Sequence, residues 1–134
     1  MNFTIKPLHC GMSVSDLDAS IRWFHEILGF DEISRDELPD AGFKLAFIRN
    51  GEFEIELFEP YQYIPMPEER KQPNDDVKTL GTKHICFAVD HLDHLVEHCR
   101  AHDVELVMGP LHLSGNYVCF IHGPEDILIE FIER

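Results

Sequence analysis

The sequence predicts an α+β fold made of two tandem βαβββ modules. Two observations carry this prediction: the order strand, helix and three strands occurs twice, and a histidine–glutamate pair recurs at equivalent places in both copies. The chain has 134 residues, 44% hydrophobic and 27% charged, which is ordinary for one soluble globular domain. We expect one domain over residues 1–134, with a first module at about 1–60, a connector at about 61–80 and a second module at about 81–134.

The first module is expected to begin with a strand at 5–14 and a helix at 17–28. Ser15 or Asp16 can cap the helix, because a short side-chain oxygen accepts a hydrogen bond from the free N–H groups of the first turn. Gly29 ends the helix, since glycine readily takes the left-handed conformation of a C-terminal cap. One apolar stripe at helical spacing consists of Leu17, Ile21, Phe24 and Leu28.

Three short strands complete this module, near 30–37, 43–49 and 53–59. Asn50-Gly51 predicts a tight hairpin turn between the last two strands.

The second half of the chain repeats the order of elements. A strand is expected at 83–89, and a helix at about 91–102 with Asp90 as its cap. Its apolar stripe consists of Leu92, Leu95, Val96 and Cys99. Strands follow near 104–108, 116–122 and 127–133, with a turn at Gly123-Pro124.

The connector between the modules is rich in proline. Its prolines exclude a central strand or a regular helix through most of it, because proline lacks a backbone N–H and fixes φ. They are Pro60, Pro65, Pro67 and Pro73. The connector either folds over a site or only links the modules.

Composition excludes several classes of partner. The formal net charge of −14 repels a phosphate backbone, so we expect no nucleic-acid partner. No apolar run approaches the ~20 residues of a membrane helix, and the N-terminus lacks a signal pattern, so we expect no membrane association and a cytoplasmic location. The cysteines lie in apolar segments without a C-x-x-C pair and predict buried free thiols. They are Cys10, Cys86, Cys99 and Cys119.

A matched spacing of histidine and glutamate identifies the candidate site. His9 and Glu56 are 47 residues apart (56 − 9), and His84 and Glu130 are 46 apart (130 − 84). The surrounding text also matches, FEIELFE against ILIEFIE. Each histidine is expected in the first strand of its module and each glutamate in the last, as a module used twice requires.

Strand alternation separates the glutamates from the helix-facing side chains. Ile55 and Leu57 share the face expected to pack under a helix, while Glu56 lies on the other face. Glu130 lies among apolar neighbours, where a lone carboxylate is costly unless it is paired or metal-bound.

Two imidazoles and two carboxylates suit Zn²⁺, Ni²⁺, Co²⁺, Fe²⁺ or Mn²⁺ and leave positions open for water or substrate. We therefore expect one divalent ion per site, held by His9, Glu56, His84 and Glu130. The alternative is that both histidines are ordinary core residues and both glutamates face solvent.

Four segments carry a family resemblance: LHCGMSVSDLDASIRWFHEILGF, EIELFEP, KHICFAVDHLDHL and ILIEFIE. Over nearly the whole chain the sequence resembles the glyoxalase superfamily, also called vicinal oxygen chelate proteins. The resemblance implies curved mixed sheets around a metal-binding cup, and a homodimer. It also matches the same two histidines and two glutamates to the metal-ligand positions of glyoxalase I (lactoylglutathione lyase).

The resemblance implies a lyase or isomerase that moves a proton next to a metal-chelated carbonyl of a small substrate. The metal acts as a Lewis acid, and a carboxylate transfers the proton between adjacent carbons. Glu130 matches the base, and Glu56 can serve the opposite face. The alternative for both glutamates is permanent ligation without proton transfer.

Two departures from glyoxalase I argue against a glutathione adduct as the substrate. The arginine and asparagine that hold glutathione in that family are Ser13 and Pro60 here. The segment LPDAGFKLAF with EIELFEP is also similar to methylmalonyl-CoA epimerase. Asp40 stands where that family has a glutamate base, and is either a substrate contact or a turn residue.

Further candidates lie near the expected site. Glu54 shares a strand face with Glu56 and contacts substrate or lies at the rim. His122 contacts substrate or caps the following turn. Cys86 lies on the face of His84 and lines the cup or simply packs. A row on the second helix reads as a solvated face: His94, His98 and His102.

Three other functions remain as alternatives: a methylmalonyl-CoA-epimerase-like epimerase, a non-haem iron dioxygenase, and a non-catalytic small-molecule binding or resistance protein. Dioxygenase chemistry usually uses two histidines and one carboxylate, so a fourth ligand argues against it. Relatives in the binding branch generally lack the metal ligands, so keeping all four counts against that function.

Overall fold

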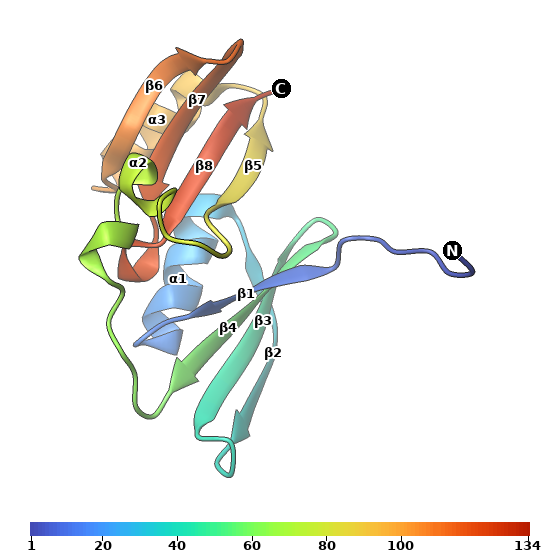
Figure 1. The fold of residues 1–134 in the computed structure, drawn as a ribbon. Coiled ribbons are helices and arrows are strands. Elements are labelled where there is room, and N and C mark those ends of the chain that lie inside the picture. Colours follow the sequence, from blue (N-terminus) through green and yellow to red (C-terminus); the bar gives the residue numbers. More distant parts are fainter. The chain divides into compact units, whose positions relative to one another are not determined.

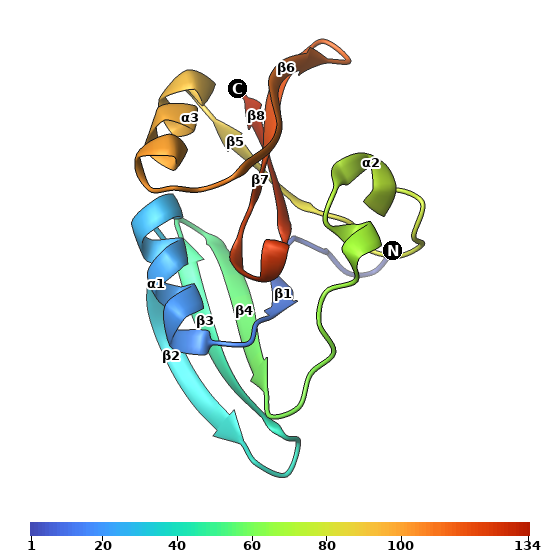
Figure 2. The ribbon, with the colours of Figure 1, turned by 90° about the vertical axis from the view of Figure 1, so that its left-hand side faces the viewer.

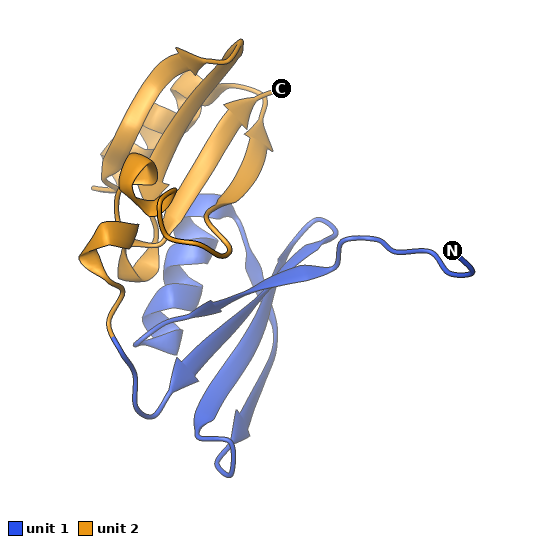
Figure 3. Cartoon of the chain, in the orientation of Figure 1, with its two compact units in different colours: residues 1–64 blue, residues 65–134 orange.

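The computed structural model describes residues 1–134, which form two compact units, Met1–Ile64 and Pro65–Arg134 (Figure 3). Each unit contains one four-stranded sheet and one helix of ten or more residues. The predicted α+β fold with two tandem βαβββ modules is therefore confirmed.

In unit 1 the first and last strands of the module are neighbours in the sheet, which has the order β1-β4-β3-β2 (Figure 1). β1 runs parallel to β4, and the other two pairs are antiparallel. The elements are β1 (His9–Ser13), α1 (Leu17–Leu28), β2 (Asp31–Leu38), β3 (Phe43–Asn50) and β4 (Phe53–Pro60).

Unit 2 repeats this topology with the order β5-β8-β7-β6, again with a parallel pair between its first and last strands. Its module contains β5 (Ile85–Val89), α3 (Leu92–Ala101), β6 (Leu106–Leu113), β7 (Asn116–His122), the 3-10 turn η2 (Pro124–Asp126) and β8 (Leu128–Glu133). Two short helices of the connector precede them, η1 (Glu68–Arg70) and α2 (Pro73–Asp76).

Each helix covers one face of its own sheet, as Figures 1 and 2 show for α1 and α3. Burial of apolar side chains under the helix drives this packing. The core of unit 1 consists mainly of Leu17, Ile21, Phe24, Ala46, Ile48, Ile55 and Leu57, and that of unit 2 of Leu92, Val96, Cys99, Cys119, Ile121, Ile129 and Phe131. The opposite face of each sheet carries the candidate ligands.

The expected first strand at 5–14 is too long, because β1 begins only at His9. Pairing starts where His9 lies opposite Glu54, and β4 begins one residue earlier at Phe53. A strand needs a hydrogen-bonding neighbour, and residues 5–8 have none in β4. For the same reason His84 lies directly before β5 and not within the expected strand at 83–89.

β6 is longer than the expected strand at 104–108. It extends through Gly109-Pro110 to Leu113, with irregular register against β7 around the proline. Proline is tolerated there because β6 is an edge strand and the missing N–H falls at a bulge.

Helix α1 begins and ends as predicted, with Asp16 as its N-cap and Gly29 in the left-handed region at φ 71°. The predicted cap at Asp90 is wrong. The N-cap of α3 is His91, whose side chain makes no capping hydrogen bond, and the first helical N–H, of Leu92, meets Glu133 instead.

The connector is fastened to unit 2 by a buried carboxylate. Asp76 is 2% exposed and accepts hydrogen bonds from Arg70 Nε at 2.8 Å and Lys83 Nζ at 3.2 Å. Arg70 also donates to the Thr82 carbonyl oxygen at 2.7 Å. These contacts hold residues 70–76 against the segment that leads into His84.

All four cysteines are free thiols. Cys99 and Cys119 are buried as expected, but Cys10 is half-buried and Cys86 is exposed. Burial was expected for Cys86 from its apolar neighbours, but it lies on the sheet face that α3 does not cover. No helix of the chain has the length and apolar character needed to cross a membrane.

Candidate metal centre

In unit 1 the parallel pairing of β1 with β4 brings His9 and Glu56 together. Gly11 lies directly opposite Glu56, and His9 is two residues earlier on the same face. His9 Nε2 is 3.7 Å from Glu56 Oε1. The contact joins residues that are far apart in sequence, and it follows from the return of the last strand beside the first.

Unit 2 repeats this arrangement with His84 and Glu130. Cys86 lies opposite Glu130, and His84 is two residues before Cys86. His84 Nε2 is 2.6 Å from Glu130 Oε2, so these two side chains are in direct contact. Each unit therefore presents one imidazole nitrogen and one carboxylate on the sheet face opposite its helix.

The chemistry of these donors fits a divalent transition metal. Imidazole nitrogen and carboxylate oxygen are the ligands that zinc, nickel, cobalt, iron and manganese share. Neither unit by itself gathers three or more metal-ligating side chains. Each unit therefore offers two of the donors that the sequence prediction assigns to the metal ion.

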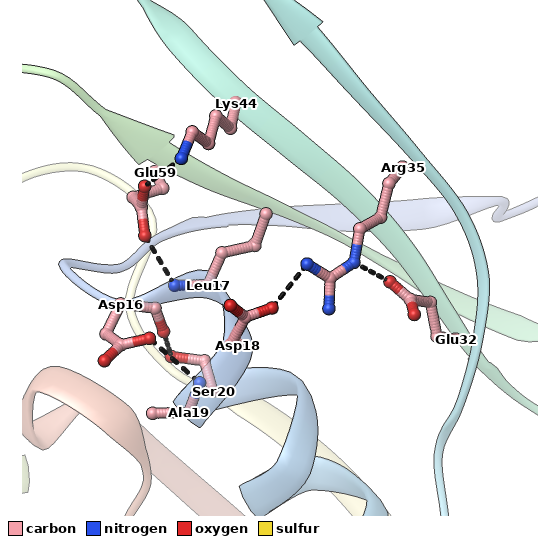
Figure 4. A network of polar contacts seen from close by, with 9 residues as sticks. All are labelled: Asp16, Leu17, Asp18, Ala19, Ser20, Glu32, Arg35, Lys44 and Glu59. Atoms are coloured by element: carbon pink, nitrogen blue, oxygen red, sulfur yellow. Dashed lines mark hydrogen bonds and ion pairs between the residues drawn. The ribbon is translucent and has the colours of Figure 1, made fainter.

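A second glutamate in each last strand caps the helix of its unit, a role that the sequence reasoning missed. Glu59 Oε1 accepts from the Leu17 N–H at 2.8 Å, beside the Asp16–Ala19 cap, as Figure 4 shows. Glu133 Oε2 accepts from the Leu92 N–H at 3.0 Å. Glu59 follows Glu56 by three residues and Glu133 follows Glu130 by three, so the repeated E-x-x-E spacing was an available signal.

The same close-up shows how α1 is held against β2 by charge. Arg35 lies between Asp18 of the helix and Glu32 of its own strand and contacts both carboxylates (Figure 4). Lys44 Nζ lies 3.8 Å from Glu59 Oε2. These charges lie on the helix side of the sheet, so they support the fold and do not lie on the face that carries His9 and Glu56.

Two further predicted site residues, Glu54 and Asp40, lie outside the histidine–glutamate pairs. Glu54 is next to His9 in the register and 3.3 Å from Arg49 Nη2. Asp40 is exposed in the turn between β2 and β3. Substrate contact by either residue stays a prediction.

His122 is occupied by protein partners at both ring nitrogens. Its Nε2 is 2.7 Å from the Lys71 carbonyl oxygen, and its Nδ1 is 3.0 Å from Glu105 Oε2 and 3.6 Å from Asp126 Oδ1. These contacts tie the connector to the end of β7. Substrate contact by His122 also stays a prediction.

Cys86 and the histidines of α3 lie outside the donor pairs. Partial desolvation of the Cys86 thiol and, to a lesser degree, the Glu130 carboxylate raise the pKa of Cys86 to about 11, so its thiol stays protonated at neutral pH. The rings of His98 and His102 lie against each other at the end of α3, with centroids 4.4 Å apart and an interplanar angle of 50°, and His102 Nδ1 is 2.9 Å from the His98 carbonyl oxygen.

The chain belongs to the Glyoxalase/Bleomycin resistance protein/Dioxygenase superfamily, whose sequence profile matches residues 6–131. The predicted membership of the glyoxalase superfamily is thereby confirmed.

Named relatives and solved structures cover almost the whole chain. The lactoylglutathione lyase of Haemophilus influenzae is 30% identical over 133 residues, covering 95% of this chain and 91% of that protein. The protein YaeR of Escherichia coli K12 is 31% identical over 131 residues, 94% of each chain. The trypanothione-dependent glyoxalase I of Leishmania major has a TM-score of 0.76 at 25% identity, covering 97% of this chain and 87% of that one. A glyoxalase family protein of Bacillus cereus has a TM-score of 0.77 at 25% identity, covering 98% and 95%.

Proposed function

We propose that the chain is a divalent-metal-dependent, glyoxalase I-like lyase or isomerase, in which His9, Glu56, His84 and Glu130 bind one metal ion. The observation that carries the proposal is the duplicated histidine–glutamate pair, which has the same strand register in both units. Duplication of a donor pair on the face opposite the helix is difficult to explain by packing alone, because a half-buried carboxylate is stabilised mainly by a charged or metal partner.

The proposed reaction is proton transfer between adjacent carbons of a small carbonyl substrate. A bound divalent ion supplies Lewis acidity toward the substrate carbonyl. Glu130 removes a proton from the neighbouring carbon and returns it to the other carbon, so that the carboxylate is regenerated in each turnover. Glu56 serves the opposite face of the substrate.

The proposed substrate is a small molecule other than a glutathione adduct. The Haemophilus influenzae relative is named a lactoylglutathione lyase, and the Leishmania major structure is described as trypanothione-dependent. In this chain Ser13 and Pro60 occupy the two positions at which the resemblance to glyoxalase I calls for glutathione contacts, and neither provides a cation or an amide. Hemithioacetals of glutathione, of trypanothione and of small thiols, tested side by side, distinguish these substrates.

We further propose a cytoplasmic homodimer. Four free thiols support a reducing compartment. The donor pairs of one site come either from one chain or from two copies, and mixing inactive variants decides between these arrangements. If the pairs come from two copies, a mixture of His9→Ala and His84→Ala protomers regains sites with four donors. If they come from one chain, the mixture stays inactive.

Metal content is the first test. The untagged protein is expected to hold about one ion per chain by mass spectrometry. Glu56→Ala, Glu130→Ala and His84→Ala each lose the ion, and His98→Ala, which removes a surface histidine of α3, retains it. A wild type that stays metal-free after dialysis against Zn²⁺, Ni²⁺, Mn²⁺ or anaerobic Fe²⁺ excludes the proposed function.

Isotope exchange tests the reaction itself. Turnover in D₂O is expected to place deuterium in the product, because the carboxylate proton exchanges with solvent. Consumption of oxygen by the iron-loaded protein without such exchange would instead identify a dioxygenase.

A further inference from the structure

We infer that Phe47 and Phe120 are positioning residues that hold the two metal-ligating imidazoles in their ligand orientation. The inference rests on the proposed function. In unit 1, Phe47 of β3 lies directly opposite Glu56 in the antiparallel register. In unit 2, Phe120 of β7 lies directly opposite Glu130. Each phenylalanine therefore shares the sheet face of its unit's donor pair.

Each aromatic ring is in direct contact with the histidine of its unit. The ring centroids of His9 and Phe47 are 5.4 Å apart with an interplanar angle of 80°. Those of His84 and Phe120 are 4.9 Å apart with an angle of 78°. Both contacts are edge-to-face, the geometry that the charge distribution of aromatic rings favours.

The three side chains recur as one set. The equivalent residues are 75 positions apart for histidine (84 − 9), 74 for glutamate (130 − 56) and 73 for phenylalanine (120 − 47). The two units have different neighbours around this set, for example Gly11 in one and Cys86 in the other. Because the same edge-to-face contact occurs in both units, it points to a role in metal binding, the function proposed for both histidine–glutamate pairs.

The physical role follows from the freedom of an imidazole side chain. A histidine at the open face of a sheet samples several rotamers, and only some direct Nε2 toward the carboxylate. A phenylalanine edge-to-face with the ring removes part of that freedom before a metal arrives. Groups that orient a metal ligand typically change metal affinity by ~10–100-fold.

Unit 1 offers a matched control on the same strand and the same sheet face. Phe43, four residues before Phe47 in β3, also makes an edge-to-face contact, with centroids 5.2 Å apart, but its partner is Phe58 and not a histidine. Phe43→Leu thus removes a comparable aromatic contact without touching a donor.

The test combines metal titration against a competing chelator with imidazole NMR of the metal-free protein. Phe47→Leu and Phe120→Leu are each expected to weaken metal binding ~10-fold, and each to shift the ring signals of its own histidine only. Phe43→Leu is expected to leave affinity and ring signals unchanged. Phe47→Met keeps bulk without aromaticity and should behave as Phe47→Leu, whereas Phe47→Tyr should restore wild-type binding.

Wild-type affinity and unchanged imidazole signals in Phe47→Leu and Phe120→Leu overturn the inference. An equal loss in Phe43→Leu also overturns it, because the effect would then be general destabilisation of the sheet. If the wild type binds no metal, the proposed function fails, while the NMR spectra of the metal-free variants still show whether each phenylalanine orients its histidine.

Discussion

The two modules have the same strand topology but differ in the distance between the histidine and the glutamate of each pair. His84 and Glu130 are in contact at 2.6 Å, whereas His9 and Glu56 are 3.7 Å apart. The two glutamates have the same strand register, but His9 is the first residue of β1 whereas His84 lies directly before β5. The two modules therefore repeat the positions of histidine and glutamate, while the surroundings of each pair differ.

The segments that lead into β1 and β5 differ as well. Residues 1–8 precede β1 without regular structure and are exposed. Before β5, Lys83 donates to the backbone carbonyl oxygens of Asp76 and Thr79 and lies next to His84. The histidine of unit 2 therefore follows an anchored segment, and the histidine of unit 1 does not.

Replacing Glu56 or Glu130, the two glutamates proposed as metal ligands, is expected to have the largest effect. Glu56→Gln and Glu130→Gln each lower metal affinity by more than ~100-fold, since a ligand should matter at least as much as the groups that orient it. In the metal-free protein Glu130→Gln should shift the NMR signals of its histidine more strongly than Glu56→Gln does, because His84 lies closer to its glutamate (2.6 Å) than His9 does (3.7 Å). Equal shifts in both variants would contradict the proposed difference between the two histidine–glutamate pairs.

Truncating an equivalent core isoleucine in each module should show that burial under the helix contributes equally to the stability of both modules. Ile55 and Ile129 are both fully buried at equivalent positions of β4 and β8. Ile55→Ala and Ile129→Ala should each cost about 2–5 kcal/mol in the free energy of unfolding, from lost burial and a new cavity. Denaturant unfolding measures both, and a loss below about 1 kcal/mol in either variant contradicts the equivalence.

The ion pairs of Asp76 with Arg70 and Lys83 should stabilise unit 2 in a pH-dependent way. Burial alone would raise the pKa of Asp76, but hydrogen bonds from Arg70 and Lys83 outweigh it and hold that pKa below its ordinary value. The folded state then binds the proton more weakly than the unfolded chain. The stabilisation is full above about pH 4 and is lost as pH falls through the lowered pKa.

Asp76→Asn should therefore cost about 2 kcal/mol at pH 7 and progressively less toward pH 2. The cost lies below that of a fully buried pair because Arg70 and Lys83 remain partly exposed. Unfolding of both proteins at several pH values measures the difference. A gap that does not change with pH would show that packing, and not charge, holds the connector.

A helix cap gives the smallest expected effect. Asp16 caps α1 at φ −140° and ψ 102°, and His91 stands at the start of α3 at φ −137° and ψ 89° without a capping contact. His91→Asp should raise the free energy of unfolding by about 1 kcal/mol, and Asp16→Ala should lower it by a similar amount. No gain in thermal denaturation of His91→Asp would mean that Glu133 already satisfies the α3 terminus.

The pattern of residues was a good guide wherever local spacing decides structure. The α1 boundaries, the order of elements along the chain and the helix-facing side chains follow from periods of 3.6 and 2 and from glycine at the turns. The cap of α3 and the length of β1 were mispredicted, because Glu133 and β4 reach those places from elsewhere in the chain. Phe47 and Phe120 were missed because a phenylalanine in a strand looks like ordinary core.

The repeat, the fold class and the two histidine–glutamate spacings can be predicted from the sequence, because they depend on periodicity and on residue identity at fixed offsets. Which side chains contact one another is visible only in the folded chain. The fold placed His84 against Glu130 and His9 farther from Glu56, gave Glu59 and Glu133 their capping roles, and bound Asp76 to two cations. Such contacts depend on strand order and register, which bring distant segments to the same place and which no local pattern encodes.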